Sequence, residues 1–430
     1  MALGSPRARV FSVDAVGPRP PPLRGGRTEP IVGEGRADPV DGWAIIARMA
    51  SPPGLVLTGG TVLDPGAGLS GVMDVRVRAG RVTAVGPGLP VDGERTIDVR
   101  GRYVVPGLID LHAHCFIGAS DLGARTDAVC ASTGVTTLVD GGSAGAGLFE
   151  GLREFVASRA RTRILAFVNI SAIGLAYLDI GELNHLPYAD PDRAAAVARE
   201  HRDIVVGIKV RSQAEVVGAA GLEPVRRAVK AADATGGRVM VHVTNPPVAL
   251  EEVVALLRPG DIVTHFLNGR GDGILDLGGR VKGAIRAARE RGVLFDVGHG
   301  RNHVNFTVAR AALGGGFPPD TISSDLTSGG RAGCVKDLPT TLSKFLNLGM
   351  SLEAVIRAAT AAPAAAIGRG GELGTLRPGA VADLAVFELE EGRFDFEDAD
   401  RQHLTGSRRL RPAMTIKDGE VWWDAGGGPR

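Results

Sequence analysis

The chain has 430 residues, of which 44% are hydrophobic and 23% are charged, a composition typical of a folded protein with a large core. Lys and Arg together number 49 and Asp and Glu number 48, so the net charge of +1 excludes strong attraction to nucleic acid or to an anionic membrane. The sequence has no apolar run of about 18 residues and only three cysteines, which excludes a transmembrane helix and a disulfide scaffold.

Residues 1–53 are rich in Pro, Gly and Arg and lack hydrophobic periodicity, as in the segment PRPPPLRGGRTEPIVGEGR. Such a segment buries too little apolar surface to offset its chain entropy. We expect a disordered tail, or a start codon assigned too early with Met49 as the true initiator. The segment lacks the apolar core of a signal peptide, so we expect a cytoplasmic protein.

Residues 54–105 and 370–428 are predicted to form β structure. The segment LVLTGGTVLDPGAGLSGVMDVRVRAGRVTAVG alternates apolar and polar residues and is interrupted by turn signals, which is typical of antiparallel strands. The segments ADLAVFELEEGRFDF and AMTIKDGEVWW show the same pattern near the other end of the chain. We therefore expect a small β-sandwich that is built from both chain ends.

Residues 106–369 and the strand that leads into them alternate short apolar runs with amphipathic helices. Each run is rich in Val, Ile and Leu, which indicates a parallel strand buried on both faces. Asp190 and Pro191 are expected to cap and start one helix, and Pro247 another. The sequence therefore predicts an α/β fold with a TIM-type (β/α)8 barrel. The eight runs are YVVPGLIDLHAH, TTLVDGG, RILAFVNIS, DIVVGIKVR, RVMVHVT, DIVTHFLNG, VLFDVGHG and TISSDL.

Metal-binding residue types lie at the carboxyl ends of five of these runs, where a barrel carries its active site. Side chains alternate along a strand, so the two histidines of the HxH motif share a face and can bind one ion. An isolated strand histidine is more often a hydrogen-bonded core residue, but the complete set predicts a metal site. Its members are His112, His114, Lys209, His242, His265 and Asp325.

Lys209 differs from the other members because an ammonium group repels cations. Burial without a partner should lower its pKa from the usual value of about 10.4. The neutral amine could then react with carbon dioxide to form a carbamate, an anionic group with two oxygens that can bridge two metal ions. The alternative is a lysine that pairs with a carboxylate at the barrel mouth.

These residues resemble those of the amidohydrolase superfamily of metal-dependent hydrolases. VVPGLIDLHAH is similar to its opening signature, and ADLAVF is similar to the return of the chain to its sandwich; the resemblance covers about residues 54–425. It implies a centre with two divalent ions. By this resemblance, the first ion is bound by His112, His114 and Asp325, the second by His242 and His265, and both by carbamylated Lys209.

The phrases GIKVR, VHVTNPP, DIVTHFLNG, FDVGHG, TISSDL and DLPTTLSKFLNLGM are similar to the dihydroorotase-like branch of amidohydrolases and deacetylases. This branch hydrolyses acetyl groups from small carboxylate-bearing molecules. Two positions depart from the pattern. Phe116 stands where dihydroorotases carry an Arg that holds the substrate carboxylate, and Thr327 stands where the branch has a His after SSDL.

We predict a metal-dependent hydrolase of the deacetylase type that cleaves an amide or ester bond in a small carboxylate-bearing substrate. The attacking group would be a hydroxide that bridges two ions, and Asp325 would take its proton and deliver it to the leaving group. Zinc is expected because imidazole ligands suit it. The alternatives are a cyclic amide hydrolase like dihydroorotase, a phosphoester hydrolase, a mononuclear deaminase of the same superfamily, and a degenerate barrel that only binds.

Three further residues are candidates for substrate contacts. Arg211 lies two residues after Lys209 and so points the same way, and Arg binds carboxylates with two parallel hydrogen bonds; the alternative is a rim arginine paired to an Asp. His299, in the GHG that ends the seventh run, could contact substrate. Asn268 could be a hydrogen-bonding contact or a turn residue.

The expected partner is a small-molecule substrate, with no nucleic acid and no membrane, and the resemblance implies a homo-oligomer. Asp110 and Asp296 are expected to orient metal ligands from behind. The remaining histidines fall in predicted loops or helices, and we expect them to be surface or structural residues. They are His185, His201, His303 and His403.

Overall fold

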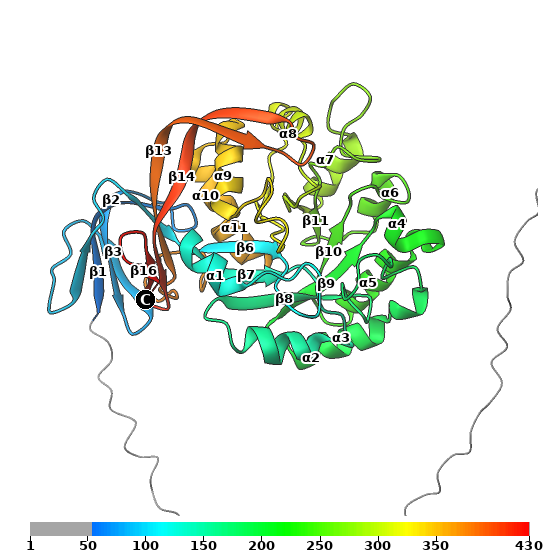
Figure 1. The fold of residues 1–430 in the computed structure, drawn as a ribbon, viewed down its shortest axis with the longest axis horizontal. Coiled ribbons are helices and arrows are strands. Elements are labelled where there is room, and N and C mark those ends of the chain that lie inside the picture. The colour runs from blue at the N-terminus through cyan, green and yellow to red at the C-terminus, as the bar shows by residue number, and fades with distance from the viewer. Residues whose placement is uncertain (1–53, 430) are drawn as a thin grey trace, which may run out of the picture. The chain divides into compact units, whose positions relative to one another are not determined.

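The computed structural model describes residues 54–429, so the predictions for residues 1–53 lie outside the described residues. The described residues belong to one compact unit, and the domain boundaries predicted within it stay predictions. They form two sheets, one from the two ends of the described region and one from its middle (Figure 1). None of the helices in residues 54–429 is long and apolar enough to span a membrane.

The sheet from the chain ends joins β5 to β13 in antiparallel pairing, with Leu384 opposite Pro106. This confirms a β unit built from both ends, but its strands pair into one continuous sheet and not into two separate ones. Val and Leu side chains from both ends form its core. In order across the sheet, the strands are β16 (428–429), β15 (Glu420–Asp424), β14 (His403–Lys417), β13 (Leu384–Glu397), β5 (Tyr103–Pro106), β1 (Leu55–Asp64), β2 (Leu69–Arg78) and β3 (Arg81–Gly86), and β4 (Arg95–Asp98) pairs with β1.

The second sheet is parallel and curled, and its seven strands follow chain order. Nearly all of their residues are buried, as the apolar runs predict. The first predicted run is divided at Pro106 and Gly107, and only its second half enters this sheet. The strands are β6 (Leu108–Ala113), β7 (Val135–Asp140), β8 (Arg163–Asn169), β9 (Val205–Arg211), β10 (Arg238–His242), β11 (Ile262–Thr264) and β12 (Leu294–Asp296).

The eighth predicted run, residues 321–326, does not form a regular strand. It makes single parallel bridges, one between Thr321 and Asp296 of β12 and one between Leu326 and Ala113 of β6. The backbone of Asp325 has a left-handed φ of 47°, and the Ser324 N–H donates to a carboxylate instead of a neighbouring strand. These two features interrupt the extended ladder that the sequence predicts.

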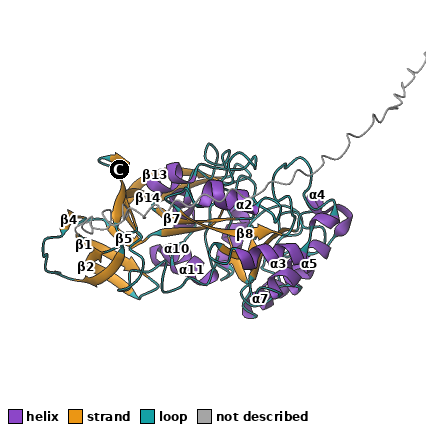
Figure 2. Ribbon diagram, turned by 90° about the horizontal axis from the view of Figure 1, so that it is seen from below, coloured by secondary structure: helices purple, strands orange, loops and turns teal. Residues whose placement is uncertain are grey.

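Helices follow most strands of the parallel sheet. Helices α3 and α5 lie side by side (Figure 2), and both pack against β9. Helix α3 begins where predicted, because the Asp190 carboxylate accepts from the N–H groups of Asp192 and Arg193. Helix α6 begins at Leu250 and not at Pro247, since the Leu250 N–H donates to Asp272. The helices are α1 (Thr126–Cys130), α2 (Phe149–Leu152), α3 (Pro191–Glu200), α4 (Ala214–Val217), α5 (Glu223–Asp233), α6 (Leu250–Ala255), α7 (Gly283–Glu290), α8 (Phe306–Gly314), α9 (Leu338–Asn347), α10 (Leu352–Ala358) and α11 (Ala361–Ala366).

Strands β13 and β14 form a long hairpin that leaves the terminal sheet and runs past α9 toward α8 (Figure 1). The tip of this hairpin, residues 398–402, contacts the loop in front of α8. The Asp398 carboxylate accepts from the Phe306 N–H at 2.7 Å, and the Asn305 side chain donates to Asp400 at 2.8 Å. The hairpin therefore connects the terminal sheet to a loop at the carboxyl end of β12.

Candidate metal centre

The six predicted metal-binding side chains line one cavity of about 210 Å³. They reach it from the ends of β6, β9 and β10, from the residue after β11 and from residues 321–326. All six are buried, with at most 6% of their surface exposed. The structure therefore brings together His112, His114, Lys209, His242, His265 and Asp325.

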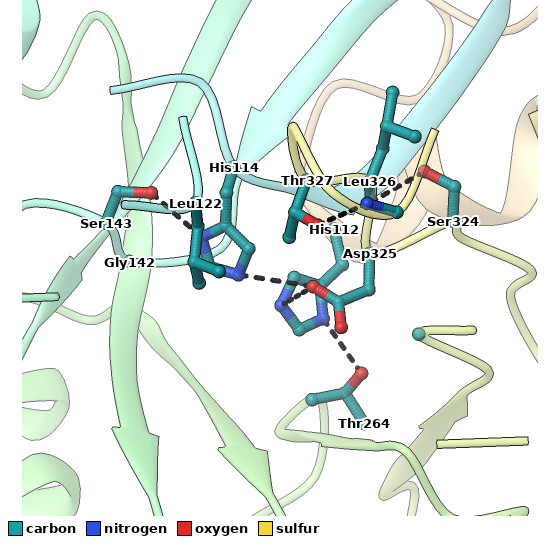
Figure 3. A network of polar contacts seen from close by, with 12 residues as sticks. His112, His114, Leu122, Gly142, Ser143, Thr264, Ser324, Asp325, Leu326 and Thr327 are labelled. Carbon is teal, nitrogen blue, oxygen red and sulfur yellow. Dashed lines mark hydrogen bonds and ion pairs between the residues drawn. The ribbon is translucent and has the colours of Figure 1, made fainter. Parts of the chain in front are cut away.

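The first cluster consists of His112, His114 and Asp325 (Figure 3). Asp325 Oδ1 lies 3.2 Å from His114 Nε2 and 3.6 Å from His112 Nε2. The two histidines point to the same side of β6, as strand alternation predicts. One atom from each residue lies within 4.8 Å of the others, which is close enough for all three to bind one ion.

In both histidines of this cluster, Nδ1 is hydrogen-bonded to a hydroxyl group. His112 Nδ1 lies 3.0 Å from Thr264 Oγ1, and the Thr264 hydroxyl donates to Asp296 at 2.8 Å. Thr264 therefore accepts from Nδ1–H, which leaves the Nε2 lone pair of His112 for an ion. His114 Nδ1 has a similar partner in Ser143 Oγ at 2.8 Å (Figure 3).

The second cluster consists of His242, His265 and His303. The Nδ1–H of His265 donates to the Gly298 carbonyl at 2.7 Å, so its Nε2 is free. His242 Nε2 is buried and has no hydrogen-bond partner within residues 54–429. A buried polar atom without a partner is costly, and a metal ion would supply the missing partner.

Burial keeps these imidazoles neutral. It lowers the pKa values of His112, His242 and His265 well below the usual range, and the positive charge of Lys209 adds to this effect on each. Burial also lowers the pKa of His303 to about 4, although Asp325 opposes the shift. Neutral imidazole is the form that binds metal ions, so the four histidines have the protonation state that ligands need.

Lys209 lies in the cavity beside the first cluster, with Nζ 2.9 Å from His112 Nε2. Burial lowers its pKa to about 8, although the Asp325 carboxylate opposes the shift. No carboxylate of the described chain lies within ion-pair distance of Nζ. The alternative of a lysine paired to a carboxylate at the barrel mouth is therefore not what the structure shows.

Comparison with known proteins agrees with this geometry. The family model of the amidohydrolase family matches residues 103–422.

The chain belongs to the amidohydrolase family.

A deacetylase of Agrobacterium fabrum is 39% identical over 346 residues, which cover 80% of this chain and 84% of the relative. The crystal structure of an adenine deaminase has a TM-score of 0.81 and 31% identity over 86% of this chain and 99% of the other. A dihydroorotase structure has a TM-score of 0.78 and 33% identity over 86% and 98% of the two chains. The amidohydrolase is thus a metal-dependent hydrolase with two candidate clusters for divalent ions.

Two site residues of this amidohydrolase have a strained backbone. His265 has a φ of 71° and Asp325 a φ of 47°, and they belong to the seven non-glycine residues with positive φ in the described chain. A left-handed backbone costs a non-glycine residue roughly 1–2 kcal/mol. Such strain is concentrated at functional sites, where the surrounding structure enforces it.

Arg211, the predicted carboxylate anchor, lines the cavity of the amidohydrolase. Its guanidinium group is already paired, with Nη1 3.2 Å from the Glu182 carboxylate and Nη2 3.0 Å from the Gln213 side chain. Glu182 is buried, so a substrate carboxylate would compete with a buried anion for Arg211. The predicted rim pairing thus exists, with a Glu in place of an Asp.

His299, a predicted substrate contact, is not among the residues that line the cavity. The ring is fully buried, with Nδ1 bonded to the Gly300 carbonyl and Nε2 2.8 Å from Lys344 Nζ. Strand alternation does not apply there, because β12 ends at Asp296 and Gly298 has a φ of 49°.

Asn268 also stays outside the cavity, which fits the turn alternative. Its side chain donates to the His265 carbonyl at 2.7 Å and accepts from the Arg270 N–H at 2.9 Å.

His303 is a cavity residue that the sequence analysis misses. The sequence predicts a surface or structural residue, but His303 lines the cavity together with its neighbour Arg301. The one signal for it is its position in the loop after the seventh strand, since the loops at the carboxyl ends of barrel strands carry site residues. The sequence has no periodicity there that could predict the direction of the ring.

Proposed function

We propose that this amidohydrolase is a binuclear hydrolase of the deacetylase type, which removes an acyl group from an amide or ester of a small carboxylate-bearing molecule. The observation that carries the proposal is the pair of clusters in one cavity, with Lys209 against His112 and with Asp325 of the first cluster also near His303 of the second. The A. fabrum relative supports it through the name deacetylase. We also propose that residues 321–326 act as the eighth strand of a (β/α)8 barrel, which their bridges to both sheet edges support.

Each cluster would hold one divalent ion, and Lys209 would contact both ions as a carbamate formed with carbon dioxide. When bound, such ions polarise a carbonyl oxygen and lower the pKa of a water molecule so that it can attack near neutral pH. Zinc suits the imidazole ligands. The lowered pKa of Lys209, about 8, makes the neutral amine accessible for carbamate formation.

Asp325 is positioned to move the proton. Its Oδ1 faces the first cluster, and its Oδ2 lies 3.6 Å from His303 Nε2. The carboxylate thus borders the space between the clusters, where it can accept a proton from the attacking water and pass it to the leaving nitrogen or oxygen. The left-handed backbone of Asp325 holds it there.

The cavity indicates a small substrate. Its volume of about 210 Å³ is below the roughly 300–1,000 Å³ of pockets that take drug-sized ligands. Three leucines supply apolar wall for an acyl group; they are Leu122, Leu175 and Leu178.

We propose Arg301 as the anchor for the substrate carboxylate. It lines the cavity and has no hydrogen-bond or ion-pair partner among residues 54–429. Arg211 is paired to Glu182, and Arg270 lies 3.7 Å from Asp400. A guanidinium group without a protein partner can bind a substrate carboxylate without leaving a protein carboxylate unpaired.

The test is a steady-state assay of the zinc-loaded protein with N-acetyl amino acids and O-acetyl 2-hydroxy acids. We expect acetate release that depends on metal and is lost in Asp325→Asn, which keeps the size of the side chain. Dihydroorotate and adenine serve as competing substrates for the alternative activities. Ring opening or ammonia release without any acetate release would overturn the deacetylase proposal.

A further inference from the structure

His303 lies next to the two histidines of the second cluster, in the loop between β12 and α8. Its ring centroid is 4.0 Å from that of His265 and 5.0 Å from that of His242. One ring nitrogen from each of the three lies within 4.8 Å of the others. The three rings are therefore close enough to share one ion.

The hydrogen bond of His303 repeats the pattern of the first cluster. Its Nδ1 lies 2.8 Å from Thr244 Oγ1, just as His112 Nδ1 is held by Thr264 and His114 Nδ1 by Ser143. Metal-binding histidines usually bond their second ring nitrogen in this way. Nε2 of His303 is then the free atom, and it makes no hydrogen bond within the described chain, since Asp325 Oδ2 is 3.6 Å away.

Gly300 allows His303 to approach the site. A Cβ at this position would lie 2.3 Å from Asp325 Oδ2 and 2.5 Å from His303 Cδ2, and Gly300 has a φ of 47°. Its N–H donates to the Ser324 carbonyl at 2.9 Å, which ties the start of the loop to residues 321–326. Any larger residue would separate His303 from Asp325.

The tip of the β13–β14 hairpin holds the other side of the loop. The Val304 carbonyl accepts from the Ala399 N–H at 3.0 Å, and the Phe306 N–H donates to Asp398 at 2.7 Å. The residues on both sides of His303 are therefore fixed by segments far away in the sequence. Backbone hydrogen bonds on both sides of His303 therefore fix the loop so that the His303 ring lies in the cavity.

We propose that His303 is a third histidine ligand at the second metal position, so that His242, His265 and His303 form a complete set of three imidazoles. This inference rests on the proposed binuclear centre. Three protein ligands with one open position is the usual arrangement of a catalytic zinc ion. The second ion would then be held by the three histidines even when Lys209 carries no carbamate.

The test is zinc binding without substrate, measured by competition with a chromophoric chelator. The unmodified chain should bind two ions. In His303→Asn the affinity of one ion should fall by more than about 100-fold, the upper end of the loss when only a supporting partner is removed. His403→Asn is the matched control, because His403 is exposed and lies outside the cavity, and it should bind both ions as the unmodified chain does. Lys209→Ala should retain the ion at the second metal position. The double variant, Lys209→Ala with His303→Asn, should lose that ion.

Unchanged affinity for both ions in His303→Asn would overturn the inference, even if turnover fell, because His303 would then act on substrate or on Asp325. The crystal structure of the zinc-loaded unmodified chain tests the same point without a variant. Its His303 Nε2 should lie about 2.0–2.1 Å from zinc, and a zinc ion without this contact contradicts the inference. An unmodified chain that binds fewer than two ions would overturn the binuclear proposal itself. Failure of the proposed function can therefore be distinguished from failure of the inference about His303.

Discussion

At the scale of single residues, the direction of the His112 ring depends on a hydroxyl group behind it. Thr264→Val should keep the shape of the side chain but remove both the partner of His112 Nδ1 and one donor to Asp296. We expect zinc affinity at the first cluster to fall about 10- to 100-fold, as measured by chelator competition.

Thr321→Val is a matched control for this prediction. The Thr321 hydroxyl also donates to Asp296, at 2.8 Å, but within residues 54–429 it makes no hydrogen bond to a cavity histidine. Thr321→Val should therefore lower the free energy of unfolding and leave zinc affinity close to that of the unmodified chain. An equal loss of affinity in both variants would show that Asp296 acts through the fold and not through the His112 ring.

Arg301 is the residue that we propose as the anchor of the substrate carboxylate. If Arg301 binds the substrate carboxylate, Arg301→Met removes a charge-assisted hydrogen bond of about 1.5–3 kcal/mol, and KM should rise roughly 10- to 100-fold. The methyl ester of the same substrate should be unaffected. Steady-state kinetics on the acid and its ester measures the difference.

Arg211→Met is the comparison for Arg301→Met. It leaves the buried Glu182 carboxylate without its cation, so we expect a lower melting temperature and an equal loss on the acid and the ester. A selective loss on the acid in Arg211→Met, with none in Arg301→Met, would return the anchor to Arg211.

At the scale of elements, helix α3 shows a local signal that acts without tertiary help. The Asp190 side chain caps its first turn by accepting from two backbone N–H groups. Asp190→Ala should lower the free energy of unfolding by about 1 kcal/mol, while Asp190→Asn, which can still cap the helix, should change it little. Urea unfolding of both variants checks this, and kcat should stay unchanged because α3 contributes no residue to the cavity.

Local signals also explain which elements can be predicted. Seven runs form parallel strands because each is a buried apolar segment between turn signals. The eighth does not, because Ser324 bonds to the Asp110 carboxylate and Asp325 adopts a left-handed backbone. Helix α6 begins three residues late because a carboxylate distant in sequence, that of Asp272, receives its first N–H group. A sequence pattern contains no information about such a partner.

At the scale of the whole molecule, the β13–β14 hairpin couples the terminal sheet to the metal centre. Asp398 is buried, and its carboxylate accepts from the N–H groups of Phe306, Asp400 and Gln402. Asp398→Ala should leave these donors unpaired and lower the free energy of unfolding by about 1–3 kcal/mol. Because Phe306 lies three residues after His303, zinc affinity at the second cluster should fall as well.

Calorimetric unfolding and chelator competition on the same sample check this coupling. Asp395→Ala is the control, since Asp395 lies on the same hairpin and, within residues 54–429, its carboxylate bonds only to the exposed His403. A loss of stability in Asp398→Ala with unchanged zinc affinity would show that the hairpin supports the fold but not the position of His303.

The sequence by itself determined the residues that are tied to strand ends. His112, His114 and Lys209 point into the cavity because strand alternation sets the direction of a side chain locally. The sequence also places His242, His265 and Asp325 at the same edge, because the carboxyl ends of the predicted parallel runs meet there, although the backbones of His265 and Asp325 are left-handed and not extended. For this reason the sequence pattern alone assigns six residues that lie far apart along the chain to one site.

Only the tertiary structure decided what the loops do. His299 and His303 lie four residues apart beyond the same strand, yet one ring is buried against Lys344 and the other enters the cavity. Past the end of a strand, the direction of a side chain depends on positive-φ glycines and on contacts with distant segments, here residues 321–326 and the hairpin tip. Those contacts have no periodicity along the chain, so the pairing of Arg211 with Glu182 and the third histidine of the second cluster are visible only in the folded molecule.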